Sequence, residues 1–250
     1  MPNHRLKPFM AVALALFAAS VLPAADFSCS SGTGRVALVE LFTSEGCSSC
    51  PPADRWLEDL RSQPGLWRDF VPVGFHVNYW DNLGWPDRFA SRQFTQRQYA
   101  LASAWRGNSV YTPCFVRNGQ EWHPDGDAPV RVAGKPGMLA VSMGEDGICR
   151  VRFAPDGGET GGAYEAHVAL LGGGYTSKVT AGENRGSTLR DEFVALALVD
   201  GPMKMESLSV TAELTLPQNP AGGAERRALA AWVTRAGSLE PVQATGGWLN

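Results

Sequence analysis

Two cysteines, Cys47 and Cys50, are separated by two serines and followed by two prolines. This spacing lets their sulfur atoms close into a disulfide with little backbone movement, as thiol-disulfide exchange requires. If a helix begins at the pair, the partial positive charge of its N-terminus stabilises a thiolate on the first cysteine. We therefore expect Cys47 to be the nucleophile, and Cys50 to attack and release a mixed disulfide formed on Cys47.

A cysteine pair with this spacing can also attach haem or bind a metal, and each of these functions requires further residues. Haem attachment requires a histidine after the second cysteine, where this chain has Pro51. A structural zinc site usually takes its other ligands from a second such pair, and the chain has none. His76 could tune a thiolate, or complete a copper site with Cys47 and Cys50, because thiolates and imidazole suit copper. A hydrogen-bonded structural histidine is the commoner case.

The residues on either side of the pair predict the elements that would position it. Residues 36–42 are apolar apart from Glu40 and predict a buried strand. Pro51 and Pro52 suit the first turn of a helix, where the missing N–H has no partner. Asn118-Gly119 predicts a hairpin turn. Further strands are expected over 71–77, 110–117 and 120–122, and a second helix over 91–105.

Beyond residue 134 the chain changes to short apolar segments separated by glycine, asparagine and proline. Many short strands with turn signals between them are typical of a β-sandwich. Residues 224–234 are equally consistent with a helix by propensity. Strands are expected over 138–143, 148–154, 163–171, 175–180, 191–199, 207–216, 226–234 and 241–248.

The first 25 residues predict a secretory signal peptide. Arg5 and Lys7 precede an apolar run over 9–22, which is too short for a permanent membrane span. We expect a periplasmic or secreted protein with no stable membrane span once this segment is removed. The formal net charge of −3 makes a nucleic acid an improbable partner, and no phosphate-loop, hydrolase or nucleotide-binding motif is present.

The chain has five cysteines, so at least one thiol is unpaired within a monomer. Cys29 and Cys149 could form a disulfide, because an oxidising compartment allows it. Cys114 follows Pro113 directly, and either a third redox thiol or a buried strand cysteine fits that position.

Two parts of the sequence resemble thioredoxin. The segment VELFTSEGCSSCP at 39–51 is similar to its strand, loop and active-site helix, and VYTP at 110–113 is similar to its cis-proline strand. The resemblance implies a cis peptide before Pro113 and contact of Thr112 and Pro113 with a protein substrate. It also implies that Glu40 relays the proton as Cys50 becomes a thiolate, the alternative being a carboxylate exposed at the sheet edge. Because Ser48-Ser49 replaces the Gly-Pro of thioredoxin, the direction of electron flow does not follow.

Over nearly its whole length after the signal segment, the chain also resembles a secreted bacterial family, domain of unknown function 1223. The segments that carry this resemblance are ELFTSEGCSSCPPAD, FHVNYWDNLGWPDRFASRQFTQRQ, SVYTPCFVRNG, AGENRG and ATGGWL. The resemblance implies a thioredoxin-like domain joined to a β-sandwich, and it supplies no reaction.

We therefore expect an α/β thioredoxin-like domain followed by an all-β sandwich-like domain, with a signal peptide at 1–25 and the two domains at 26–134 and 135–250. The expected function is a periplasmic thiol-disulfide oxidoreductase acting on protein thiols or disulfides, without a metal or other cofactor. Two alternatives stay open. One is a copper-binding protein or metallochaperone using Cys47, Cys50 and His76, and the other is a non-catalytic extracytoplasmic interaction module.

Overall fold

The computed structural model describes residues 27–125, 129, 132–158, 161–217 and 222–249, so the expected signal peptide lies outside the described residues. The helices are α1 (Pro51–Asp59) and α2 (Arg92–Ala104), with short 3-10 segments at Leu60–Ser62, Asp81–Leu83 and Asp156–Gly158. The strands are β1 (Phe27–Ser30), β2 (Ala37–Thr43), β3 (Phe70–His76), β4 (Cys114–Arg117), β5 (Gln120–Trp122), β6 (Gly137–Met143), β7 (Ile148–Pro155), β8 (Tyr164–Gly173), β9 (Tyr175–Lys178), β10 (Thr188–Asp191), β11 (Val194–Pro202), β12 (Lys204–Glu206), β13 (Ser209–Thr215), β14 (Arg226–Arg235) and β15 (Pro241–Leu249).

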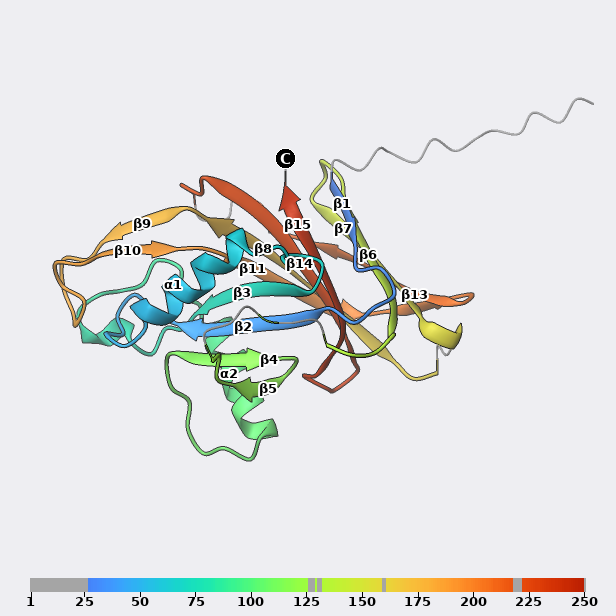
Figure 1. Cartoon of the computed structure of the whole chain (residues 1–250), viewed down its shortest axis with the longest axis horizontal. Helices are drawn as coiled ribbons and strands as arrows, with labels where there is room; N and C mark the ends of the chain where they lie inside the picture. Colours follow the sequence, from blue (N-terminus) through green and yellow to red (C-terminus); the bar gives the residue numbers. More distant parts are fainter. Residues whose placement is uncertain (1–26, 126–128, 130–131, 159–160, 218–221, 250) are drawn as a thin grey trace, which may run out of the picture.

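An eight-stranded sheet runs through the molecule in the order β15-β14-β8-β11-β3-β2-β4-β5 (Figure 1). Strands β2 and β3 are parallel, and β11 lies parallel to β3 on its other side. The remaining neighbours in this sheet are antiparallel. Strands from before and after residue 134 therefore share one hydrogen-bonded sheet.

The predicted fold class, an α/β thioredoxin-like domain followed by an all-β sandwich-like domain, is wrong. Strands dominate the described residues, which contain only two α-helices. Strand β11 pairs with β3 at Val194 and Gly74, and the Gly74 N–H donates to the Phe193 carbonyl at 2.8 Å. This pairing covers an edge that β3 would otherwise leave open. The pattern of a strand shows which residues are buried, but it does not show which strand lies beside it.

The two helices cover opposite faces of the sheet. Leu57 of α1 packs closely on Gly74, where an added Cβ would lie 3.2 Å from the Leu57 Cδ2. The next residue, Phe75, packs against Phe94 of α2 with a ring-centroid distance of 5.1 Å. Successive residues of a strand point to opposite faces, so α1 and α2 must lie on different sides of β3. At the start of α2, the Ser91 side chain accepts a hydrogen bond from the Gln93 N–H, as an N-cap residue does.

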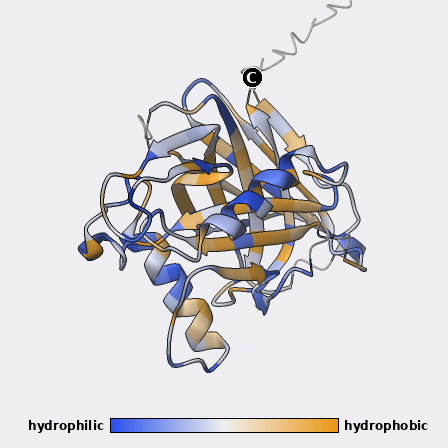
Figure 2. Ribbon diagram, turned by 60° about the vertical axis from the view of Figure 1, so that its left-hand side comes forward, coloured by the Kyte–Doolittle hydropathy of each residue, from blue (hydrophilic) through white to orange (hydrophobic). Residues whose placement is uncertain are grey.

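A second, five-stranded sheet in the order β1-β6-β7-β13-β12 packs against β8 and β14 of the large sheet. Hydrophobic residues concentrate on the strands of the interior (Figure 2). The apolar layer between the two sheets includes Val141, Phe153, Val168, Leu229 and Val233.

Residues 226–235 form strand β14 and not the helix that propensity also allowed. This strand lies between β8 and β15. Ala230 and Trp232 belong to one hydrophobic cluster, while Leu229, Ala231 and Val233 belong to another. Because both faces are buried, the sequence shows a continuous apolar run with no alternation, and its period does not separate strand from helix.

The strand register does not allow a disulfide between Cys29 and Cys149. Cys29 of β1 lies opposite Val141, and Cys149 of β7 lies opposite Met143, with β6 between them. Two strand spacings separate their Cα atoms by at least about 9.5 Å, whereas a disulfide needs less than about 7 Å. All five cysteines are free thiols in the structure.

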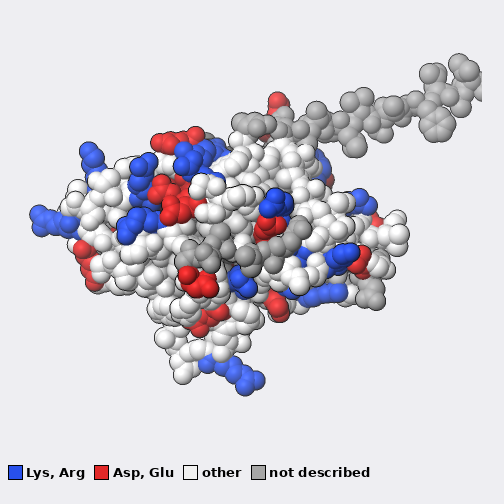
Figure 3. Space-filling model, in the orientation of Figure 1, with Lys and Arg blue, Asp and Glu red and all other residues white. Residues whose placement is uncertain are grey.

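The outer surface carries both signs of charge. Lysine and arginine side chains lie interspersed with aspartate and glutamate over the face in Figure 3. Within the described part of the chain, neither helix is long and apolar enough to cross a bilayer.

Candidate functional site

The cysteine pair lies where β2 passes through a short loop into α1. Cys50 is the N-cap residue of α1, and the prolines after it occupy the first helical positions. Both cysteines are 0% exposed. The helix N-terminus expected at the pair is present. Pro51 and Pro52 have no N–H group, and the Cys50 and Ala53 N–H groups donate to the carbonyls of Cys47 and Cys50, so the hydrogen bonds that tune the sulfurs come from other groups.

The pKa values of the two thiols are shifted in opposite directions. Cys47 Sγ lies 3.2 Å from Ser49 Oγ and 3.7 Å from the Thr112 carbonyl oxygen. Its pKa is lowered from 9.0 to about 6, chiefly by a hydrogen bond from the Cys50 thiol, against the opposing effect of burial. The pKa of Cys50 is raised strongly, first by burial, then by the bond to Cys47 and the nearby charge of Asp54. At neutral pH this arrangement favours a thiolate on Cys47 and a protonated Cys50.

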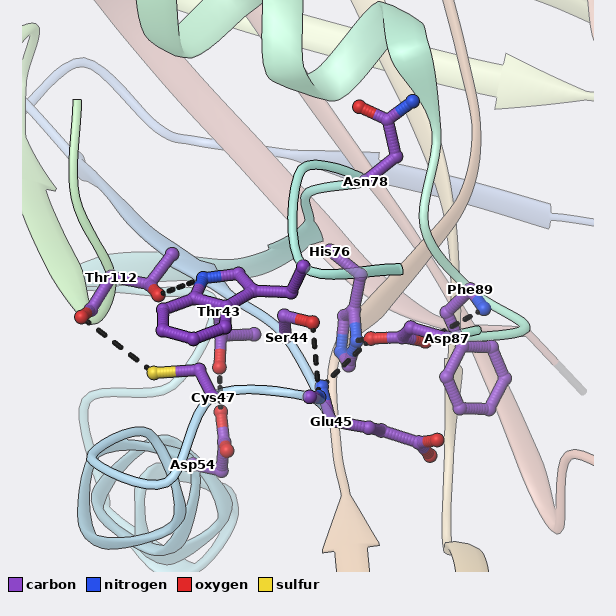
Figure 4. A network of polar contacts seen from close by, with 12 residues as sticks. Thr43, Ser44, Glu45, Cys47, Asp54, His76, Asn78, Asp87, Phe89 and Thr112 are labelled. Atoms are coloured by element: carbon purple, nitrogen blue, oxygen red, sulfur yellow. Dashed lines mark hydrogen bonds and ion pairs between the residues drawn. The ribbon is translucent and has the colours of Figure 1, made fainter. Parts of the chain in front are cut away.

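Thr112 and Pro113 border the pair from the other side. The Thr112–Pro113 peptide is cis, as the resemblance implied. Figure 4 shows the Cys47 sulfur pointing toward Thr112. The Thr112 hydroxyl accepts a hydrogen bond of 2.8 Å from the Trp80 indole N–H, which anchors this segment to the loop after β3. The partly buried indole N–H of Trp80 thereby has the hydrogen-bond partner that it needs.

Asp54 is the carboxyl group connected to Cys50. The Thr43 hydroxyl donates to Asp54 Oδ1 at 2.7 Å (Figure 4), and the same hydroxyl lowers the pKa of the Cys50 thiol, against the larger effect of burial. Burial raises the Asp54 pKa from 3.8 to about 7. Sequence analysis did not select Asp54. Its position four residues after Cys50, on the same face of α1, was the signal that could have identified it.

Glu40 is fully buried in β2, so the exposed-edge alternative does not hold. Its Oε1 accepts a hydrogen bond of 2.6 Å from Arg97 Nε, in an ion pair that links β2 to α2. The Arg97 guanidinium also lies over the rings of Phe75 and Trp232. The structure thus pairs Glu40 with a cation, and its predicted role as the proton relay for Cys50 stays a prediction.

His76 lies at the end of β3, as expected, and its Nδ1 is 2.7 Å from Asp87 Oδ2. Burial alone would lower the His76 pKa, but the Asp87 carboxylate outweighs it and the pKa rises to about 10. The charged imidazolium form has no free lone pair for a metal. Within the described residues, no group of three or more His, Cys, Asp or Glu side chains is arranged to hold a metal ion.

The other three cysteines are weakly acidic thiols. Cys114 is buried opposite Phe42, and burial raises its pKa to about 11. Burial likewise raises the pKa of Cys29 to about 11 and that of Cys149 to about 12. These thiols are expected to react much more slowly than Cys47.

A loop from the later half of the chain also reaches the pair. Residues 179–187 connect β9 to β10, and Glu183 and Asn184 bond the backbone of residues 45–48. The sequence segment AGENRG lies in this loop. Sequence analysis named the segment as part of a resemblance without a role, and only the folded chain shows that it touches the cysteine loop.

Comparison with known proteins gives a family. Residues 38–234 match the family described as "Protein of unknown function (DUF1223)". The chain belongs to the DUF1223 family. This confirms the resemblance to that family seen in the sequence. No curated protein gives a significant match.

Two solved structures resemble this DUF1223 protein. One is the crystal structure of protein AGR_C_4864 from Agrobacterium tumefaciens, which is 24% identical with a TM-score of 0.58, over 88% of this chain and 94% of that one. The other is HBP35 of Porphyromonas gingivalis, which is 14% identical with a TM-score of 0.61, over 88% of this chain and 76% of that one. At these identities the likeness concerns the fold alone.

Proposed function

We propose that this protein is a thiol-disulfide oxidoreductase that uses Cys47 and Cys50 to exchange disulfides with protein partners. The observation that carries the proposal is that the pKa values of two thiols at one helix N-terminus are shifted in opposite directions. The pKa of Cys47 is lowered to about 6, while burial raises that of Cys50. This difference in pKa suits a first thiol that attacks the partner disulfide and a second thiol that stays protonated until it attacks the mixed disulfide.

In the first step the Cys47 thiolate attacks one sulfur of a partner disulfide. The partner S–S bond breaks as the Cys47–partner bond forms, and the other partner sulfur leaves as a thiolate that takes a proton from water. Thr112 and Pro113 border this sulfur and are proposed to contact the partner chain. The neighbouring Tyr111 is 42% exposed and adds accessible aromatic surface beside them.

In the second step Cys50 becomes the attacking group. Its proton passes by way of the Thr43 hydroxyl to the Asp54 carboxylate; Thr43 donates to Asp54 at 2.7 Å and lowers the pKa of the Cys50 thiol. The Cys50 thiolate then attacks Cys47 Sγ, the mixed disulfide breaks, and the second partner sulfur leaves as a thiolate. Two electrons have passed from the cysteine pair to the partner. The same steps in reverse oxidise a partner dithiol.

The proposed location is the periplasm or the cell exterior, where disulfides form and persist. The support for it is the signal-like sequence of residues 1–25. An export system recognises a signal peptide by its basic residues and the apolar run that follows them, and this segment has both.

An equilibrium redox titration tests the proposed function. The purified protein is equilibrated with glutathione or dithiothreitol couples, and the state of Cys47 and Cys50 is read by thiol alkylation and mass spectrometry. We expect a reversible potential between about −120 and −270 mV. A disulfide with a potential below about −300 mV, or thiols that do not cycle, would overturn the proposal in favour of a structural pair. Cys47→Ser and Cys50→Ser variants identify the signal that belongs to the pair.

A further inference from the structure

Backbone hydrogen bonds within the loop between β9 and β10 hold this loop in shape beside the cysteine pair. The Val179 N–H donates to the Ser187 carbonyl at 3.0 Å, and the Gly186 N–H donates to the Val179 carbonyl at 2.8 Å. Within the loop, the Ser187 N–H donates to the Asn184 carbonyl at 3.0 Å. The backbone of Asn184 is thereby held in place, so its side chain is presented from a preorganised turn.

The side-chain amide of Asn184 hydrogen-bonds the loop that carries the proposed nucleophile. Its Nδ2 donates to the Glu45 carbonyl and to the Cys47 carbonyl, each at 2.9 Å, although it is 137 residues away from Cys47. The residue is 7% exposed. A primary amide has two N–H groups, and both are used here.

Other groups hold the same short stretch of backbone. The Cys50 N–H donates to the Cys47 carbonyl at 3.2 Å, so this oxygen accepts bonds from both the helix start and Asn184. The Glu45 N–H donates to Asp87 at 2.9 Å, and the Ser48 N–H donates to Glu183 at 3.1 Å. Asn184 is the member of this set that binds residues on both sides of Gly46.

We propose that Asn184 is a positioning residue, which holds the backbone of residues 45–47 so that Cys47 Sγ faces Cys50, Ser49 and Thr112. This inference rests on the proposed function and assigns a role to the AGENRG segment. Hydrogen bonds to sulfur act only at short range, and the Ser49 hydroxyl, which can donate to the Cys47 thiolate, lies 3.2 Å from its sulfur. If the carbonyls lose their donor, the loop relaxes and the thiolate loses part of its stabilisation. A purely structural asparagine would change the stability of the fold and leave the thiolate chemistry of folded molecules unchanged.

Two substitutions of Asn184 test the proposal in the full chain. Asn184→Ala removes the amide, and Asn184→Asp keeps the shape but places a carboxylate against two carbonyl oxygens. The rate of Cys47 alkylation by iodoacetamide is followed from pH 4 to 10 by mass spectrometry of the Cys47 peptide, alongside the redox titration. We expect the midpoint of the pH profile to rise by at least about one pH unit, which means about tenfold less thiolate at pH 5. The potential should become more negative, because the reduced form loses stabilisation.

Asn118→Ala is the matched control. Asn118 also makes a side-chain bond to backbone, accepting from the Leu38 N–H at 2.9 Å, but it lies in the β4–β5 turn. Its substitution should lower stability without moving the Cys47 profile. Folding of each variant is checked by circular dichroism, and the isosteric Asn184→Asp gives the result if Asn184→Ala does not fold.

The outcomes separate the two proposals. A wild-type midpoint near pH 9 would overturn the assignment of Cys47 as the activated nucleophile, and with it the proposed function. A wild-type midpoint near pH 6 that stays unchanged in a folded Asn184 variant would overturn only the positioning role of Asn184. A midpoint that rises equally in Asn118→Ala would also refute that role.

Discussion

Asp54→Asn removes the group that is proposed to receive the proton of Cys50 and changes little else. The asparagine has the shape of aspartate, and its carbonyl oxygen can still accept the Thr43 hydroxyl bond, which is 2.7 Å long in the structure. It cannot accept a proton from a thiol near neutral pH. The substitution should therefore slow the attack by Cys50 and spare the attack by Cys47.

The size of the effect follows from the raised pKa of Asp54, which burial moves to about 7. About a tenth of Asp54 is ionised at pH 6 and about half at pH 7, so the wild-type second step should accelerate about fivefold between these values and level off above about pH 8. Loss of a general base typically costs about 10²- to 10⁴-fold. We expect Asp54→Asn to be about 100-fold slower at pH 7. Its rate should then rise with hydroxide and show no plateau near pH 8.

A single-turnover reaction with a chromogenic aromatic disulfide separates the two steps. The reduced protein releases one coloured thiolate when Cys47 attacks and a second when Cys50 resolves the mixed disulfide. Stopped-flow absorbance between pH 5.5 and 9 gives both rates. Cys50→Ser should abolish the second release and serves to identify it.

Glu40→Gln is the matched comparison, because Glu40 is the other buried carboxyl to which a relay was assigned. If the proton passes through Asp54 and not through Glu40, this substitution leaves the pH profile of the second step unchanged. A wild-type profile in Asp54→Asn would refute the relay through Asp54. If Glu40→Gln alone removed the plateau, the proton would pass by way of Glu40 instead.

Two further predictions concern the fold. Arg97→Leu should destabilise the protein by about 3–5 kcal/mol in guanidinium unfolding, because it leaves the fully buried Glu40 carboxylate without its partner; a loss below about 1 kcal/mol would show that this ion pair contributes little. Peptide mapping without reduction should find no disulfide between Cys29 and Cys149, because β6 lies between their strands; such a link would contradict the register of the five-stranded sheet.

Local elements could be predicted where the residues themselves determine the backbone. The prolines after Cys50 predicted the start of α1 at Pro51. Asn118-Gly119 predicted a hairpin turn, and both residues have the positive φ angles, 52° and 78°, that a type I′ turn requires. Most strands after residue 134 lie close to the predicted ranges, whereas β10 and β12 were not predicted. In these cases the signal depends on neighbouring residues, so the sequence contains it.

The arrangement of those elements could not be predicted in the same way. The fold class was wrong because β11 joins β3 and merges strands from both halves of the chain into one sheet. The residues near the cysteines resemble a strand, loop and helix of thioredoxin. This local resemblance does not determine how the strands of a whole domain pair. Strand pairing depends on which edges meet in space, and the hydrophobic pattern of one strand does not specify its partner.

The sequence by itself determined the kind of chemistry available, because two thiols at this spacing beside helix-starting prolines suit exchange. Only the tertiary structure decided the acidity of each thiol and the groups that surround the pair. Asp54 accepts a bond from Thr43 and its charge raises the pKa of Cys50, Arg97 pairs with Glu40, and Asn184 bonds the Cys47 loop from 137 residues away. Hydrogen bonds and burial act over a few ångströms in space. Their partners are therefore set by how distant segments pack.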